Sequence, residues 1–287
     1  MMNTYLEYAA RGKNAWWRYL LTPVLGLLLT GVAGTALALA LTLAHLMPPD
    51  IAVQMQQPKF IGPFYLGIAL CFGLLTVCFA FTAYLIQGKR PADIIGQWRT
   101  KFFVQGLAIW LCVQAALALI DFAIAPGSFS LSVNSGTFKL ASLALVGILI
   151  QTFTEEFLFR GYLTQGLLLA FKKPVPAAIV SGLLFGSLHI PNGWAQALNA
   201  VAFGIVCALI AIRTGGIALT CGVHLANNYF GAAIVVSGSD VFRGSPGFIT
   251  QTAPQLLWWD LCLGVVTLAA MFWLVFRRRY FCDAPAG

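Results

Sequence analysis

Three ionisable residues stand close together in the apolar stretch QTFTEEFLFRGYL, residues 151–163. On a helix, Glu156 and Arg160 share one face at a spacing of four, with the carboxylate before the cation, which is the favourable order. Glu155 lies about 100° round the helix from Glu156 and has no basic partner three or four residues on. We therefore expect Glu156 to pair with Arg160 as a structural brace and Glu155 to be available as a base. The alternative is a polar cluster that only pins helices together.

A second polar group follows in SGLLFGSLHIPNG, residues 181–193. Gly182 and Gly186 form a GxxxG face, which lets another helix backbone approach closely. Phe185 and His189 are four apart on that same side. His189 is therefore expected to point into the helix interface and away from lipid, either as a functional group or as a core histidine that bonds a neighbouring helix.

The third group lies in TCGVHLANNYFG, residues 220–231. His224 and Asn228 are four residues apart and share a helix face. An unpaired asparagine is costly in hydrocarbon, so Asn228 should have a polar partner. The alternative is that both residues only join helices by hydrogen bonds.

Together these side chains form a set that suits hydrolysis. Glu155 with His189 could hold and deprotonate a water molecule. His224 and Asn228 could donate hydrogen bonds to the oxyanion of a tetrahedral intermediate. Glu155, His189 and His224 could instead bind zinc, but the sequence has no HExxH motif and does not require a metal.

The elements that must position these groups are membrane-spanning helices. The 287 residues are 60% hydrophobic and only 9% charged, whereas soluble domains carry roughly 25% charged residues. Mean hydropathy is +0.84. A soluble fold of this size could not bury so much apolar surface. We predict an all-α polytopic bundle of about eight spans, near residues 19–47, 60–87, 102–125, 139–171, 175–191, 194–212, 216–237 and 257–276.

The net charge of +8 is spread over short basic runs between the apolar stretches, which argues against nucleic-acid binding. In an eight-span arrangement these runs all fall on one side, and the loops on the other side are poor in Lys and Arg. The positive-inside rule then predicts that both termini are cytoplasmic. Asp121, near the outer end of the third span, is expected only to touch the interface. The basic runs are Arg11, Lys13 and Arg18; Lys89, Arg90, Arg99 and Lys101; Lys172 and Lys173; Arg213; and Arg277, Arg278 and Arg279.

The polar groups resemble the three motifs of the CPBP family, in the family's order and in apolar helices. That family comprises the type II CAAX prenyl proteases and the bacteriocin-processing or self-immunity (ABI) proteins. The resemblance covers about residues 140–235. The matching motifs are EExxxR at Glu155, Glu156 and Arg160, FxxxH at Phe185 and His189, and HxxxN at His224 and Asn228.

The resemblance implies an α-helical intramembrane endopeptidase. In the family, the first glutamate and the FxxxH histidine activate the attacking water, which assigns that role to Glu155 and His189. The HxxxN pair stabilises the oxyanion, which assigns that role to His224 and Asn228. The family is often labelled a metalloprotease family, and a metal-free glutamate mechanism is also argued. We favour no cofactor here, with zinc as the alternative.

The resemblance also divides the chain. Residues 1–138 hold three spans without a catalytic motif, residues 139–237 form the CPBP-like catalytic core, and residues 238–287 hold the last span and a basic cytoplasmic tail. The expected setting is a bacterial inner membrane, and the expected partner is a membrane-associated protein or peptide substrate. A prenylated Cys-a-a-X protein, a leader peptide, a bacteriocin and a membrane regulator remain equal possibilities, and so does the side to which the site opens.

Two other functions compete with the protease. One is a proton-coupled transporter, in which the buried Glu and His side chains relay protons. No inverted repeat is evident, and the ionisable groups cluster in spans four to seven, which disfavours it. The other is a non-catalytic immunity or scaffold protein of the same fold. The intact motifs disfavour that function.

Overall fold

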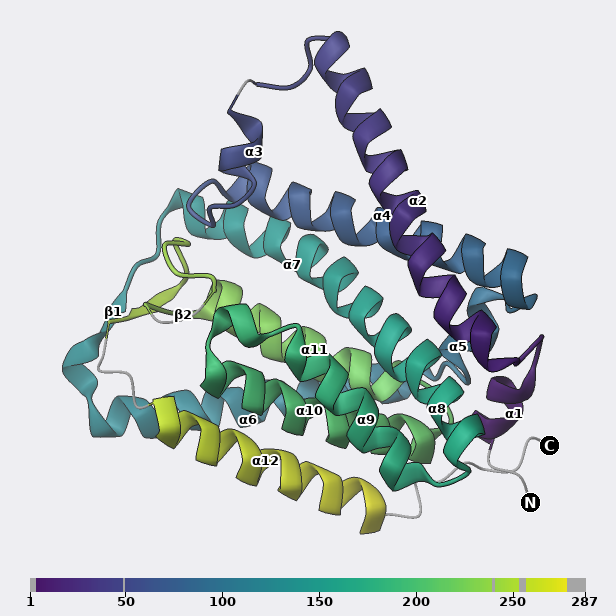
Figure 1. The fold of residues 1–287 in the computed structure, drawn as a ribbon. Helices are drawn as coiled ribbons and strands as arrows, with labels where there is room; N and C mark the ends of the chain where they lie inside the picture. The colour runs from purple at the N-terminus through teal and green to yellow at the C-terminus, as the bar shows by residue number, and fades with distance from the viewer. Residues whose placement is uncertain (1–3, 49, 239–240, 253–256, 278–287) are drawn as a thin grey trace.

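A computed structural model describes residues 4–48, 50–238, 241–252 and 257–277, and most of them are helical (Figure 1). The predicted all-α class is therefore confirmed. The first half contains α1 (Thr4–Ala10), α2 (Trp16–Leu43), α3 (Ile51–Gln54), α4 (Ile61–Gln87), α5 (Pro91–Ile95), α6 (Thr100–Ile124), the 3₁₀ turn η1 (Pro126–Ser128) and β1 (Phe129–Leu131). The second half contains α7 (Ser135–Glu155), the π-helix η2 (Glu156–Leu163), α8 (Thr164–Phe171), α9 (Pro174–Ser187), the 3₁₀ turn η3 (Ile190–Asn192), α10 (Trp194–Thr214), α11 (Ala218–Tyr229), the π-helix η4 (Phe230–Ile234), β2 (Val235–Ser237), β3 (Ile249–Gln251) and α12 (Leu257–Arg277).

Helices occur at all eight predicted places, but not all of them are long and apolar enough to count as membrane spans. Among the described residues, five helical segments are long and apolar enough to cross a membrane: 16–43, 61–87, 100–124, 135–171 and 194–214. The helix α9 and the 262–277 part of α12 are apolar but shorter. The segment 135–171 is a single continuous helix that includes η2. The count of eight spans stays a prediction.

Two groups of helices pack together. In Figure 1, α2 packs on α4 and α4 packs on α7, and α6, α9, α10, α11 and α12 form the other part of the bundle. The central core lies in this second group, with Trp110, Phe185 and Phe203 among its buried side chains.

Glycines let the helices that carry the polar motifs approach closely. A Cβ on Gly222 of α11 would lie 2.1 Å from the carbonyl oxygen of Phe103 on α6. A Cβ on Gly186 of α9 would lie 2.8 Å from the carbonyl oxygen of Ala197 on α10. The GxxxG face predicted from the sequence therefore packs against α10, as such a spacing allows.

Local sequence signals fix where the long helices begin and end. The Asn134 side chain accepts hydrogen bonds from the backbone N–H groups of Gly136 and Thr137, which caps the start of α7. Gly88 and Gly215 end α4 and α10 in the left-handed conformation, at φ of 70° and 81°. These boundaries determine where each motif lies along the length of the bundle.

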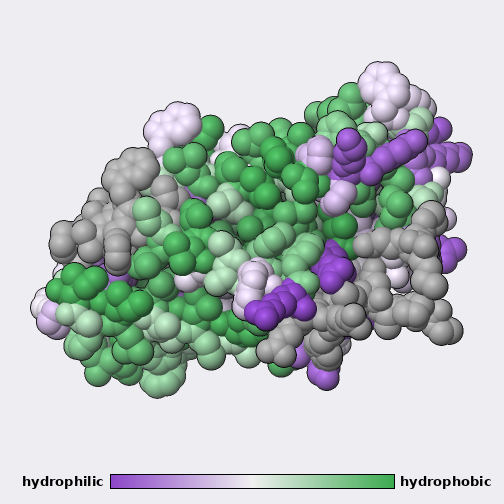
Figure 2. Space-filling model, turned by 90° about the horizontal axis from the view of Figure 1, so that it is seen from below, coloured by the Kyte–Doolittle hydropathy of each residue, from purple (hydrophilic) through white to green (hydrophobic). Residues whose placement is uncertain are grey.

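The two ends of the bundle differ in charge. At one end, hydrogen bonds join the basic loops. The backbone N–H of Lys13 donates to the Gln87 carbonyl at 2.7 Å, and the Lys89 ammonium donates to the Ala9 carbonyl at 2.7 Å. In the face that Figure 2 shows, hydrophilic side chains gather toward the right of the view, and apolar side chains cover most of the rest. We call the end that carries these basic loops the basic end.

The opposite end carries a small sheet that the sequence did not suggest. Its order is β1-β3-β2, with β3 antiparallel to β1 and parallel to β2. It joins the loop after α6 to the loop between η4 and α12 (Figure 1). We call this region the sheet end.

Candidate active site

The EExxxR stretch lies at the junction of α7 with the π-helix η2. A π-helix widens the turn and leaves carbonyl groups that need other donors. The Thr164 hydroxyl donates to the carbonyl of Phe159 at 2.7 Å, and the Tyr5 hydroxyl donates to that of Arg160. The sequence did not predict this helix type, which begins directly after Glu155 and orients the charged side chains that follow.

Glu156 and Arg160 form a fully buried ion pair. Arg160 Nη1 lies 3.0 Å from Glu156 Oε1, and neither side chain is exposed. The guanidinium also packs over the Phe185 ring, 4.1 Å from its centre. The brace expected from the sequence is therefore present, with an aromatic face as its third side.

His224 lies between the two glutamates, which the sequence did not predict. Its Nδ1 is 2.9 Å from Glu156 Oε1, and its Nε2 is 3.5 Å from Glu155 Oε2. A carboxylate can only accept, so Nδ1 carries a proton, and a second proton on Nε2 would make a donor on the Glu155 side. Glu156 therefore braces the histidine of the third motif as well as Arg160.

Glu155 is the less buried of the two carboxylates. Its side chain keeps 14% exposure, whereas that of Glu156 has none. Gln151, one turn earlier, donates to Glu155 Oε1 at 3.1 Å. The predicted difference between the two glutamates is present. Gln151 shares the helix face of Glu155, as its spacing of four predicts, and His224 is the neighbour that the sequence did not predict.

His189 lies just beyond α9, and its ring packs against Phe185. The ring centres are 4.7 Å apart, and its Nδ1 is 2.9 Å from the Phe185 carbonyl oxygen. Phe185 also contacts His224, at 6.0 Å between ring centres. Among the described hydrogen bonds, none joins His189 to Glu155 directly.

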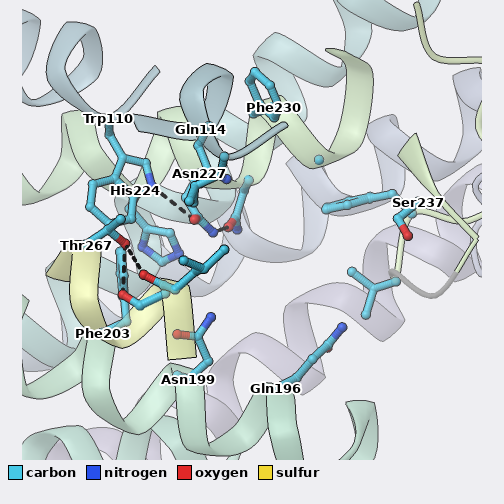
Figure 3. Close-up of a pocket in the computed structure, with 18 of the residues that line it drawn as sticks. Trp110, Gln114, Gln196, Asn199, Phe203, His224, Asn227, Phe230, Ser237 and Thr267 are labelled. Carbon is cyan, nitrogen blue, oxygen red and sulfur yellow. Dashed lines mark hydrogen bonds between the residues drawn. The ribbon is translucent and has the colours of Figure 1, made fainter. Parts of the chain in front are cut away.

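Asn228 is oriented by two residues that the sequence analysis missed. Trp110 Nε1 donates to Asn227 Oδ1 at 3.1 Å, and Asn227 Nδ2 donates to Asn228 Oδ1 at 3.1 Å (Figure 3). The Asn228 oxygen thus accepts, and its NH₂ group remains as a donor. The doubled asparagine in ANNY was a local signal for this arrangement, but Trp110 lies 117 residues away in sequence.

A cavity of about 420 Å³ runs from the FxxxH and HxxxN residues to the sheet end. Glu155 is not among the residues that line it and lies beside its wall at His224. Gln151, Phe185, His189, His224 and Asn228 line it. At the sheet end its walls include Asn192, Val235, Ser237, Val241 and Gln251. Asp121 also lines the cavity, where the sequence suggested only an interfacial position.

The cavity does not have the side-chain arrangement of a metal site. Among the described residues, no group of three or more His, Cys, Asp or Glu side chains is placed to hold a metal ion. Glu155, His189 and His224, the predicted ligands of a possible zinc, therefore do not fit one as they are arranged.

Comparison with known proteins bears on this part of the chain. Residues 137–230, which contain all three motifs, match the family model described as type II CAAX prenyl endopeptidase Rce1-like. The expected CPBP resemblance is confirmed. The Rce1-like segment supports an intramembrane protease of the CAAX type in general terms. It also agrees with an integral membrane protein.

A similar curated protein extends the likeness beyond the Rce1-like segment. The uncharacterized protein YyaK of Bacillus subtilis (strain 168) is 29% identical over 273 residues, which cover 90% of this chain and 90% of YyaK. No solved structure matches the chain. The roles of individual residues therefore rest on the geometry above.

Proposed function

We propose that the protein is an intramembrane endopeptidase that hydrolyses a peptide bond in a membrane-associated protein or peptide. The observation that carries the proposal is the position of His224. Its ring lies at the cavity wall, with Nε2 3.5 Å from Glu155 and Nδ1 2.9 Å from the buried Glu156. A base, a donor and a fixed orienting carboxylate thus meet where a substrate carbonyl can enter.

In the proposed reaction, Glu155 and His189 hold a water molecule beside the scissile carbonyl. Glu155 accepts a proton from the water as its oxygen bonds to the carbonyl carbon. The oxyanion that forms accepts hydrogen bonds from the Asn228 amide and from His224 Nε2, which donates because the ring is protonated on both nitrogens in the proposed reaction. Glu155 then returns the proton to the amide nitrogen, the C–N bond breaks, and a carboxyl and an amino product leave. The Glu156–Arg160 pair and Phe185 act through the residues they position.

We further propose that the basic end is cytoplasmic, in a bacterial plasma membrane, so that both termini are cytoplasmic. Since the cavity reaches the sheet end, substrate then enters from the non-cytoplasmic side. Single cysteines placed at exposed Ser130 and Lys172, in a chain without the native cysteines, test this orientation. A membrane-impermeant maleimide should label Ser130→Cys in intact spheroplasts and Lys172→Cys only after lysis. The reverse pattern would contradict the proposal.

Cleavage itself is tested by comparing membrane peptidomes of cells with the wild-type and Glu155→Gln proteins. A peptide that accumulates uncleaved is then assayed with purified protein in liposomes. Glu155→Gln, His189→Ala and His224→Ala should each abolish cleavage while the protein still inserts. Glu7→Gln, at an exposed site on α1, is the matched control and should keep full activity. Full activity of Glu155→Gln would exclude the proposed base.

Two further measurements separate the alternatives. Proton-coupled flux into liposomes that requires Glu155 would support a transporter instead. Activity should survive exhaustive chelation, because the described side chains form no metal cluster. Loss of activity on chelation, with recovery on adding zinc, would contradict the metal-free mechanism. A protein that inserts but cleaves nothing in either assay would match the scaffold alternative.

A further inference from the structure

One face of α6 forms a wall of the cavity. Its charged residue, Asp121, lies at the end of α6 that is far from the motif residues. The face consists of Trp110, Gln114, Leu117, Ala118 and Asp121, at the three- and four-residue spacing of a single helix face. Trp110 stands beside the motif residues, since it bonds Asn227. Asp121 is eleven residues further along α6, which corresponds to about 16 Å at 1.5 Å per residue.

Asp121 is the one carboxylate among the described residues that line the cavity, and no Lys or Arg is among them. Its Oδ1 is buried and has no hydrogen-bond partner in the described part of the chain. A carboxylate oxygen in such a place lowers the free energy of a cation that enters the cavity and disfavours an anion. The sheet end of the cavity thus favours the binding of a cation.

The wall between the two ends is rich in carboxamides, which suit an extended peptide backbone. Gln114, Gln196 and Asn199 point into the cavity from α6 and α10 (Figure 3). Each carboxamide offers both a donor and an acceptor, so it can pair with peptide N–H and C=O groups that would otherwise lack partners at this depth.

Resting on the proposed function, we propose that Asp121 selects substrates with a positively charged side chain or amine several residues from the scissile bond. An extended chain rises about 3.3 Å per residue. A span of about 16 Å along α6 therefore corresponds to about five residues between the scissile carbonyl and the cation. The substrate class is a peptide segment with a Lys, Arg or free amine at that distance, bound through its backbone in between.

The test measures binding separately from turnover. The probes are ten-residue, fluorescein-labelled peptides with acetylated and amidated ends, in which a single Lys replaces norleucine at each position in turn. The protein is the Glu155→Gln variant in nanodiscs, so that no probe is cleaved and Glu155 does not attract the Lys. We expect the best Lys peptide to bind about tenfold tighter than the norleucine peptide.

Asp121→Asn, added to this protein, should remove that preference and leave the norleucine peptide's affinity unchanged. Asp50→Asn is the control, because Asp50 lies outside the cavity. Equal binding of Lys and norleucine peptides, or a preference that persists in Asp121→Asn, would overturn the inference. With wild-type protein, mass spectrometry should place the cut about five residues from the Lys. Selective binding without any cleavage would refute the protease proposal and leave the cation site standing.

Discussion

The buried Glu156–Arg160 pair allows stability and catalysis to be separated by substitution. Neither side chain is exposed, and their charged atoms are 3.0 Å apart. Glu156→Met leaves the Arg160 guanidinium as an uncompensated buried charge, which costs about 3–5 kcal/mol. The double variant Glu156→Met/Arg160→Met removes both charges and should recover this cost, while both variants lose a further amount of about 1–3 kcal/mol for the unpaired N–H of His224.

Activity should follow a different order, because Glu156 Oε1 is also the acceptor for His224 Nδ1 at 2.9 Å. The Met/Met variant lacks that acceptor and should lose about 100-fold in kcat, the effect of misplacing a reacting group by about 1 Å. The matched double variant Glu156→Gln/Arg160→Met keeps an amide oxygen as an acceptor and should recover most of the activity.

The assays are thermal unfolding in detergent, followed by tryptophan fluorescence, and peptide cleavage in liposomes. Glu156→Met as stable as the wild type would refute the argument from buried charge. Full activity of the Met/Met variant would show that Glu156 does not position His224. Either result is informative alone, since the two readouts depend on different contacts of the same carboxylate.

Three further predictions follow from other contacts. Trp110→Phe removes the hydrogen-bond donor to Asn227. It should lower kcat about fivefold with little change in KM, because one hydrogen bond contributes about 1 kcal/mol. An unchanged kcat in the cleavage assay would contradict the orienting role of Trp110. Gly222→Ala puts a Cβ 2.1 Å from a carbonyl of α6 and should destabilise by about 1–3 kcal/mol in thermal unfolding. Gly31→Ala, with no atom within 4 Å of its Cβ, is the control and should not destabilise, because alanine is the better helix former. Burial lowers the pKa of Lys89 to about 8, so below that pH the folded state holds a buried cation. Between about pH 8 and 10 the folded state loses a proton that the unfolded state keeps, and the free energy of unfolding should therefore rise with pH. Lys89→Met should remove that rise.

Much of the site was predictable because its signals are local. The spacing of Glu156 and Arg160 within one helix predicts their pairing, and the structure has it at 3.0 Å. The glycines at 182 and 186 predict a tight interface, and α9 does pack closely on α10. The all-α class follows from composition alone, since so apolar a chain requires helices whose backbone bonds are satisfied internally.

Other features could not be predicted, because they depend on contacts between distant segments. Whether His224 meets Glu155 or Glu156 depends on how α11 lies against the α7–η2 junction, and the sequence analysis paired Glu155 with His189 instead. The placement of Asp121 in the cavity follows from the path of α6 past α11. In the three-stranded sheet, β1 pairs with β3 from more than 100 residues away, and segments of three residues have no periodic signal of their own.

The sequence by itself determined the helical membrane class, the three motifs and the different environments of Glu155 and Glu156. These follow from composition and from side chains within two turns of one another, where helix geometry fixes the distance. The tertiary structure alone decided that one histidine contacts both carboxylates, that Trp110 orients Asn228 through Asn227, and that the cavity runs toward Asp121 and the sheet end. Those contacts depend on where each helix crosses its neighbours, which is set by close packing over the whole bundle rather than by any single stretch of sequence.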